Sequence, residues 1–259
     1  MVEICQNDLP IRPWEDTRLN RLPGLNPTAP GEWLIQDDAY AAQMAYRVTL
    51  MRDHQDAVHR LSSDARAAAR ELLETVLDEL ANTDGFQVSR TEVRCPDGRV
   101  VKIDERAPLL TCGALVQEDF VIMQKQGDEH VLTGAILCFP ASWSLAQKYM
   151  RPMLRIHKPV AAYTDDIARR VQRLFDGIRT QRPMWRANHL LYDDPELHQP
   201  RTEEDRRDGS GEGPKWLRVE RQGMRRLPVT DAVVFSIHTY VLSDARLRQL
   251  NIQVPGLHN

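Results

Sequence analysis

The sequence predicts an α+β fold built on an antiparallel sheet, with its helices segregated to one face. Two hairpin signals support the sheet, because the turns Pro96-Asp97-Gly98 and Gln126-Gly127-Asp128-Glu129 each separate two short apolar runs. A third signal is a group of β-type runs near the end of the chain, which indicates a three-strand meander. The expected strands are 86–94 and 100–103, then 115–124 and 130–139, and finally 185–192, 215–222 and 232–241.

The helices are expected between and before these strands. Asp37-Asp38 starts a helix that runs to about His59, and Ser62 or Ser63 caps a second helix. A short helix follows Pro140, from about Ser142. The last expected helix begins after a Thr164 cap and has one apolar face. The apolar stripes of the second and last helices are Leu72, Leu73, Val76, Leu77 and Leu80, and Ile167, Val171, Leu174 and Ile178.

Three segments follow from this order of elements. Residues 1–84 form an arm and a helical extension, because five prolines before position 31 exclude a long helix there and leave Trp14 and Trp33 to pack on the body. Residues 85–245 form the sheet domain, and 246–259 form a weakly patterned tail. The charged, glycine-bearing stretch 201–213 is expected to be a mobile surface insertion or a lid.

Composition excludes several classes of protein. The 259 residues carry a formal charge of −3 without a basic tract, which argues against nucleic acid as a partner. Four scattered cysteines form no C-x-x-C pair, so neither a zinc site nor an iron–sulfur cluster is indicated. No apolar run reaches the ~20 residues of a membrane span and no signal peptide is recognisable, so a cytoplasmic protein is expected.

Candidate site residues lie on the middle strand of the expected meander. Alternation places Arg218, Glu220 and Gln222 on one face of that strand and Arg221 on the other. This face either lines a ligand pocket or carries solvated ion pairs of small value. Arg226 follows the strand on a turn.

A second candidate lies in the stretch from Gly134 to Val160. Its end, Ile156-His157-Lys158-Pro159-Val160, holds a histidine close to a proline, an arrangement that suits axial ligation of haem iron. The alternative is an ordinary core or surface histidine. His198, in Leu197-His198-Gln199-Pro200, is the second candidate for the iron ligand.

Five ordered motifs resemble the haem-binding (alpha) subunit family of the haem-dependent oxidative N-demethylases, which are PAS-type haem proteins. They cover most of residues 20–245 and are the segments 33–41, 115–119, Leu137-Cys138-Phe139-Pro140 with Trp143 and the His157 motif, 217–222, and Arg226-Leu227-Pro228. The sequence departs from the family at two positions. His189 stands where the family more typically carries an aromatic residue, and His238 stands where it carries arginine, so we expect an altered pocket that accepts a bulkier amine or supports a different oxidation.

The resemblance implies a PAS-like sheet that binds haem b through His157 and oxidises a secondary amine with dioxygen. Arg218, Arg221 and Arg226 are then candidate catalytic cations, since arginine stays protonated and stabilises negative charge on bound oxygen. Glu220 is the expected partner of the cationic amine. Gln222 and Asn188 complete the expected substrate contacts.

Electrons must come from another protein, because no glycine-rich dinucleotide fingerprint is present. The resemblance implies a reductase that carries NAD(P)H, flavin and iron–sulfur cofactors. Three alternatives stay open: a PAS gas sensor or carrier without turnover, a divergent haem PAS enzyme acting on another nitrogen-containing biosynthetic substrate, and a haem-free binding protein. The sequence does not indicate the oligomeric state.

Overall fold

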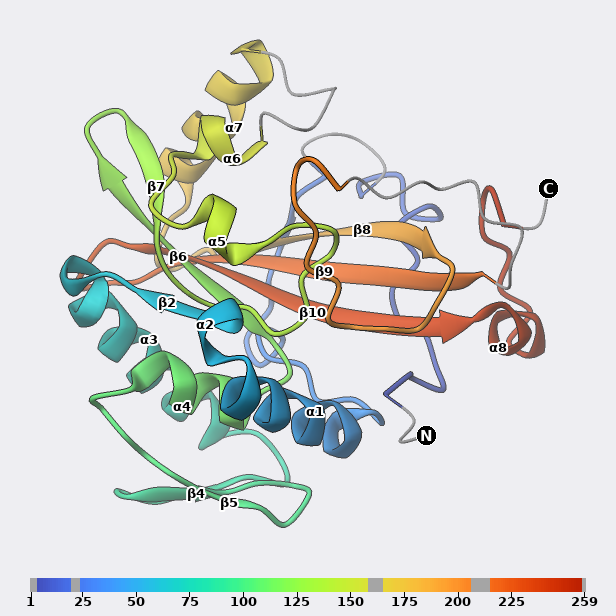
Figure 1. Ribbon diagram of the computed structural model, residues 1–259, viewed down its shortest axis with the longest axis horizontal. Coiled ribbons are helices and arrows are strands. Elements are labelled where there is room, and N and C mark those ends of the chain that lie inside the picture. Colours follow the sequence, from blue (N-terminus) through green and yellow to red (C-terminus); the bar gives the residue numbers. More distant parts are fainter. Residues whose placement is uncertain (1–3, 20–23, 158–164, 206–214, 258–259) are drawn as a thin grey trace.

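The computed structural model describes residues 4–19, 24–157, 165–205 and 215–257, with the side chains of 157 and 165–170 left out. Its main feature is a seven-stranded sheet in the order β1-β8-β9-β10-β6-β7-β2, in which every neighbouring pair is antiparallel (Figure 1). The strands of this sheet are β1 (Asn26–Pro27), β2 (His59–Leu61), β6 (Asp119–Gln126), β7 (Glu129–Ile136), β8 (Met184–Tyr192), β9 (Trp216–Arg226) and β10 (Val233–Ser243). A small separate sheet comprises β3 (Gln87–Val88), β4 (Glu92–Arg94) and β5 (Val100–Lys102).

Helices cover both faces of the large sheet, so the prediction that they lie on one face is wrong. One layer packs on the face that carries Val121, Met224 and Ile237, and the other packs on the face that carries Phe120 and Ile122. The first layer consists of α5 (Leu145–Lys148), α6 (Met153–His157) and α7 (Asp165–Gly177). The second consists of α1 (Tyr40–Asp53), α3 (Arg66–Leu80) and α4 (Pro108–Leu115) (Figure 1). Three short elements complete the order: α2 (Gln55–Val58), the 3-10 turn η1 (Ser63–Ala65) and α8 (Asp244–Gln249).

Most of the predicted elements are present. The two hairpins and the meander are confirmed as β4-β5, β6-β7 and β8-β9-β10. Ser62 accepts a hydrogen bond from the Ala65 backbone N–H, as expected of a helix cap, and α3 buries Leu72, Leu73 and Val76. In α7, Val171 and Leu174 pack on the sheet as predicted. The Thr164 cap lies outside the described residues, as does most of 201–213.

Several element boundaries differ from the prediction. The run 86–94, predicted as one strand, is two antiparallel strands, β3 and β4, and β9 continues through Gly223 to Arg226, which was predicted to lie on a turn. The first helix ends at Asp53 instead of His59, and the chain then turns through α2 into β2, which pairs with β7. Residues 108–115 form α4, for which no element was predicted, and the strand predicted from Leu115 begins at Asp119. The start of that segment is apolar all round, so its pattern does not separate helix from strand.

A buried ion pair fastens the helical extension to the sheet. Arg47 of α1 is fully buried and donates to Asp119 Oδ1 of β6 at 2.7 Å and to the carbonyl oxygens of Gly113, Gln117 and Glu118. Asp119 in turn accepts hydrogen bonds from the backbone N–H groups of Cys138 and Phe139. The Asp119 carboxylate therefore holds both α1 and the segment after β7. That segment forms one wall of the site described next.

Candidate functional site

The alternation predicted for β9 is confirmed and produces a buried polar row. Glu220 is 5% exposed, and its Oε1 lies 3.1 Å from Nη2 of Arg218, while its Oε2 accepts from Gln222 Nε2 at 3.0 Å. Arg218 is itself 1% exposed. The row shares its face of β9 with Met224, which packs in the core cluster that includes residues of α5, α6 and α7.

The neighbouring strands extend this row sideways. Asn188 of β8 and Thr239 of β10 stand directly opposite Glu220, and Arg186 of β8 stands opposite Gln222. Directly opposed residues on antiparallel strands share a face, so Asn188, Glu220 and Thr239 form a line across three strands. The buried atoms Asn188 Oδ1, Thr239 Oγ1 and Arg186 Nε have no hydrogen-bond partner among the described residues.

Arg218 connects the row to the segment that follows β7. Its guanidinium donates to the carbonyl oxygens of Phe139 and Leu197 and lies 5.8 Å from the centre of the Tyr192 ring. Each of these contacts restricts the guanidinium, so Glu220 is held by a cation that cannot swing away. Breaking a buried pair of this kind on one side costs about 3–5 kcal/mol.

The other two candidate arginines have different surroundings. Arg226 caps the carboxyl end of α7, because its Nε and Nη2 donate to the carbonyl oxygens of Ile178 and Phe175. Arg221 lies on the opposite face of the sheet, as alternation predicted, with its guanidinium 4.8 Å from the Trp185 ring centre. Both contacts are structural, so the geometry favours Arg218 over these two as the arginine of the site.

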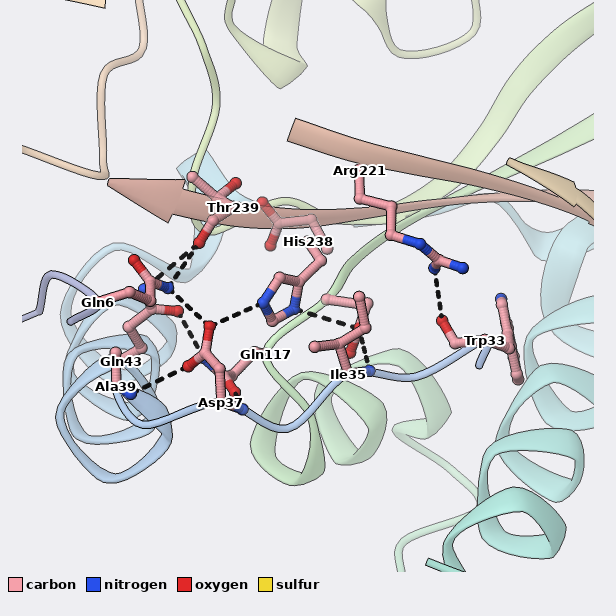
Figure 2. A network of polar contacts seen from close by, with 12 residues as sticks. Gln6, Trp33, Ile35, Asp37, Ala39, Gln43, Gln117, Arg221, His238 and Thr239 are labelled. Atoms are coloured by element: carbon pink, nitrogen blue, oxygen red, sulfur yellow. Dashed lines mark hydrogen bonds and ion pairs between the residues drawn. The ribbon is translucent and has the colours of Figure 1, made fainter. Parts of the chain in front are cut away.

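The opposite face carries a second polar network, shown in Figure 2. His238 is 1% exposed; its Nε2 lies 3.0 Å from Asp37 Oδ2, and its Nδ1 lies 3.3 Å from Glu118 Oε1 at an ion-pair distance without hydrogen-bond geometry. Burial disfavours the imidazolium, but the two carboxylates outweigh it and raise the pKa of His238 to about 9. The network ties the arm to β10, since Asp37 Oδ2 also accepts from Gln6.

The predicted histidine ligands have unequal structural support. The backbone of His157 ends α6, which packs against β7, and its side chain lies outside the described residues. His198 is half-buried, and its Nδ1 is 2.7 Å from the Cys138 carbonyl oxygen. That contact places the ring proton on Nδ1 and leaves Nε2 available, which is the state that metal-ligating histidines adopt.

The two departures from the family pattern lie away from the polar row. His189 points to the same face as Val219 and stacks edge-on with Trp14 at 5.1 Å, and His238 lies in the network beside Asp37. We expected these residues to alter the ligand pocket. Strand alternation instead places them on the face opposite Glu220, so the geometry does not support that expectation.

Sequence reasoning missed Arg186 and Thr239. Neither stands in the strand whose alternation was informative, and both join the site only through cross-strand register. The unpartnered atoms noted above are donors and acceptors that a ligand on this face could satisfy, because buried polar groups are rarely left without a partner.

The fold and the row together define an α+β protein with a buried polar row on one face of an antiparallel sheet. A family model described as "haem-dependent oxidative N-demethylase, alpha subunit-like" matches residues 24–257. The chain therefore belongs to this family, as the motifs predicted, and the match includes every residue of the row.

The residues present fit a haem group with its small-molecule substrate. Arg186 and Arg218 supply cations, and the acceptors of Asn188, Glu220 and Thr239 face the same space. No group of three or more His, Cys, Asp or Glu side chains within the described ranges is arranged to hold a bare metal ion. Haem requires none, because the porphyrin supplies four ligands and the protein needs only an axial one. Among the helices that the structure describes, none has the length and apolar character to cross a membrane.

Proposed function

We propose that this protein is the haem-binding, amine-oxidising component of an oxygenase that acts on a secondary amine by oxidative N-demethylation. The family membership supports the haem dependence and the oxidative chemistry. The observation that carries the amine assignment is the buried carboxylate of Glu220, which is held between Arg218 and Gln222 on the ligand-facing side of β9.

The scaffold assignment is a PAS-type domain. The order β7-β6-β10-β9-β8, with α5, α6 and α7 between the hairpin and the meander, supports it. In this arrangement the polar face of the sheet would contact haem b, and His157 is the residue proposed to hold its iron. His198 is the alternative ligand, supported by the bond from its Nδ1 to Cys138.

The polar row performs the binding steps. Arg218 and Gln222 orient the Glu220 carboxylate, and its Oε2, which accepts one hydrogen bond from Gln222, keeps a free lone pair for an amine N–H. The Asn188 carbonyl, directly across the strand pair, is a second acceptor for the same ammonium. Haem held here would supply the activation of dioxygen, with two electrons from a separate reductase, so that one oxygen atom would enter a C–H bond next to nitrogen and the other would leave as water. The resulting carbinolamine breaks down to formaldehyde and the shortened amine.

The test begins with the purified chain and added haem. A Soret band is expected for the wild type and for His54→Ala, a surface control, and its loss or shift in His157→Ala or in His198→Ala identifies the axial ligand. With a chemical reductant and dimethylamine, we expect amine-dependent oxygen consumption and formaldehyde release. Oxygen binding without amine-dependent turnover contradicts the proposal and favours a sensor or carrier.

The role of Glu220 is tested by Glu220→Gln, with the exposed Glu92→Gln as the matched control. Loss of a charge-assisted contact of about 1.5–3 kcal/mol should lower kcat/KM for the amine about 10- to 100-fold. The haem spectrum should be unchanged in both variants. Unchanged amine affinity and turnover in Glu220→Gln would show that the carboxylate does not bind the substrate.

A further inference from the structure

The site contains one more arginine than it has carboxylates. Arg186 and Arg218 both face the row, and Glu220 is the one carboxylate on that face of β8, β9 and β10. Arg218 pairs with Glu220 at 3.1 Å, whereas Arg186 makes no ion pair with the described residues and its Nε has no hydrogen-bond acceptor among them. A half-buried guanidinium whose inaccessible Nε has no acceptor is unfavourable, and a ligand with an acceptor oxygen would satisfy it.

The surroundings of Arg186 also indicate that its charge is only partly compensated by the protein. Its Nε is inaccessible to solvent and has no acceptor. Burial lowers the pKa of Arg186, and the negative charge of Glu220 offsets the effect only in part. Arginine nevertheless stays protonated near neutral pH, so the guanidinium presents its fork of N–H donors to whatever occupies the face.

The donors and the unpartnered acceptors are arranged in two adjacent rows. Asn188 Oδ1, Glu220 and Thr239 Oγ1 form the acceptor row across three strands, and Arg186 stands one same-face position along β8 from Asn188. An ammonium group suits the first row, and a carboxylate suits the guanidinium in the second. A planar guanidinium is the side chain best matched to a carboxylate, because it offers two parallel N–H groups.

We propose that Arg186 is a carboxylate-binding residue of this site. The carboxylate has two possible sources, an amino-acid-like substrate that carries its carboxylate close to the secondary amine, or a propionate group of the bound haem. The inference rests on the proposed function, since it assigns a ligand group to the same sheet face.

The experiment compares Arg186→Gln with the wild type, with Arg186→Lys, which keeps the charge but not the fork, and with the exposed Arg90→Gln. One arm measures sarcosine and N-methylglycinamide binding by isothermal titration calorimetry, with the haem-loaded and the haem-free protein. These probes share the secondary amine and differ in the carboxylate. The other arm titrates haem and haem dimethyl ester by Soret absorbance, a pair that differs only in free propionates.

In one of the two arms, Arg186→Gln should weaken binding of the probe that carries the carboxylate, sarcosine or haem, about 10- to 100-fold. The variant should then bind that probe with the same affinity as the neutral probe of the pair. Arg186→Lys should weaken it less, and Arg90→Gln should leave it unchanged. The affected arm identifies the source of the carboxylate. If Arg186→Gln changes neither arm in a protein that binds haem and turns over dimethylamine, the inference fails while the proposed function stands. If the wild type binds no haem, the proposed function fails, and sarcosine binding to the haem-free protein still decides the role of Arg186.

Discussion

Stability should fall as pH rises past neutrality, because folding places His238 between two carboxylates. The pKa of His238 is raised from 6.5 in an unfolded chain to about 9 in the folded protein. This difference corresponds to about 3 kcal/mol. Since the folded pKa is the higher one, the contribution is fully present below pH 6.5 and is lost as pH rises through 9. Two titratable neighbours of the imidazole move out of this window: the hydrogen bond from His238 outweighs burial and lowers the pKa of Asp37, and burial raises the pKa of Tyr240.

The assay is urea denaturation followed by circular dichroism at several pH values between 6 and 9.5, for the wild type and for His238→Gln. The variant has no titrating group at this position, so the difference in unfolding free energy should shrink by about 3 kcal/mol across the range. His238→Arg keeps a cation beside Asp37 and Glu118 and should not lose stability in this window. Parallel pH profiles for the wild type and His238→Gln would refute the assignment of a protonated imidazole.

Two further predictions concern the positions that hold the layers together. Arg47→Met leaves Asp119 buried without its cation and should lower the free energy of unfolding by about 3–5 kcal/mol, measured from urea midpoints; a loss below 1 kcal/mol contradicts that role. Gly113→Ala places a Cβ 2.6 Å from a buried isoleucine and should cost about 1–3 kcal/mol, whereas Gly177→Ala meets nothing within 4 Å and should cost nothing in the same measurement.

The sequence predicted the sheet well because its strands carry local signals. Turn residues mark both hairpins, and the alternation in β9 is regular enough to separate Glu220 from Arg221. The layer arrangement was not predictable in the same way. Periodicity shows that a helix such as α3 has a buried stripe, but it does not show which face of the sheet that stripe covers. Helices on both faces satisfy the same pattern as helices on one.

The sequence predicted which residues of β9 share a face, whereas the site residues on β8 and β10 join them only through strand register. Glu220 and Gln222 are two residues apart, so their shared face follows from the sequence, whereas Asn188 and Thr239 reach Glu220 from positions 32 and 19 residues away. Arg186 drew no attention in the sequence because an arginine in a strand is ordinarily solvated. Its significance depends on burial and on the lack of a partner, and neither property is visible before the strands are paired.

A departure from a family pattern does not by itself indicate a change of substrate, because the residue concerned can lie on the face of the sheet opposite the candidate site. His238 stands where the family resemblance led us to expect arginine. It lies between Asp37 and Glu118, so a cation is needed at this position. A protonated imidazole meets that requirement as a guanidinium would, with a charge that is lost at high pH. The replacement therefore alters the pH dependence of the attachment of the arm and leaves the ligand-facing row of Arg186, Arg218 and Glu220 intact. Specificity for the amine should accordingly be sought on that row and in the helical layer above it.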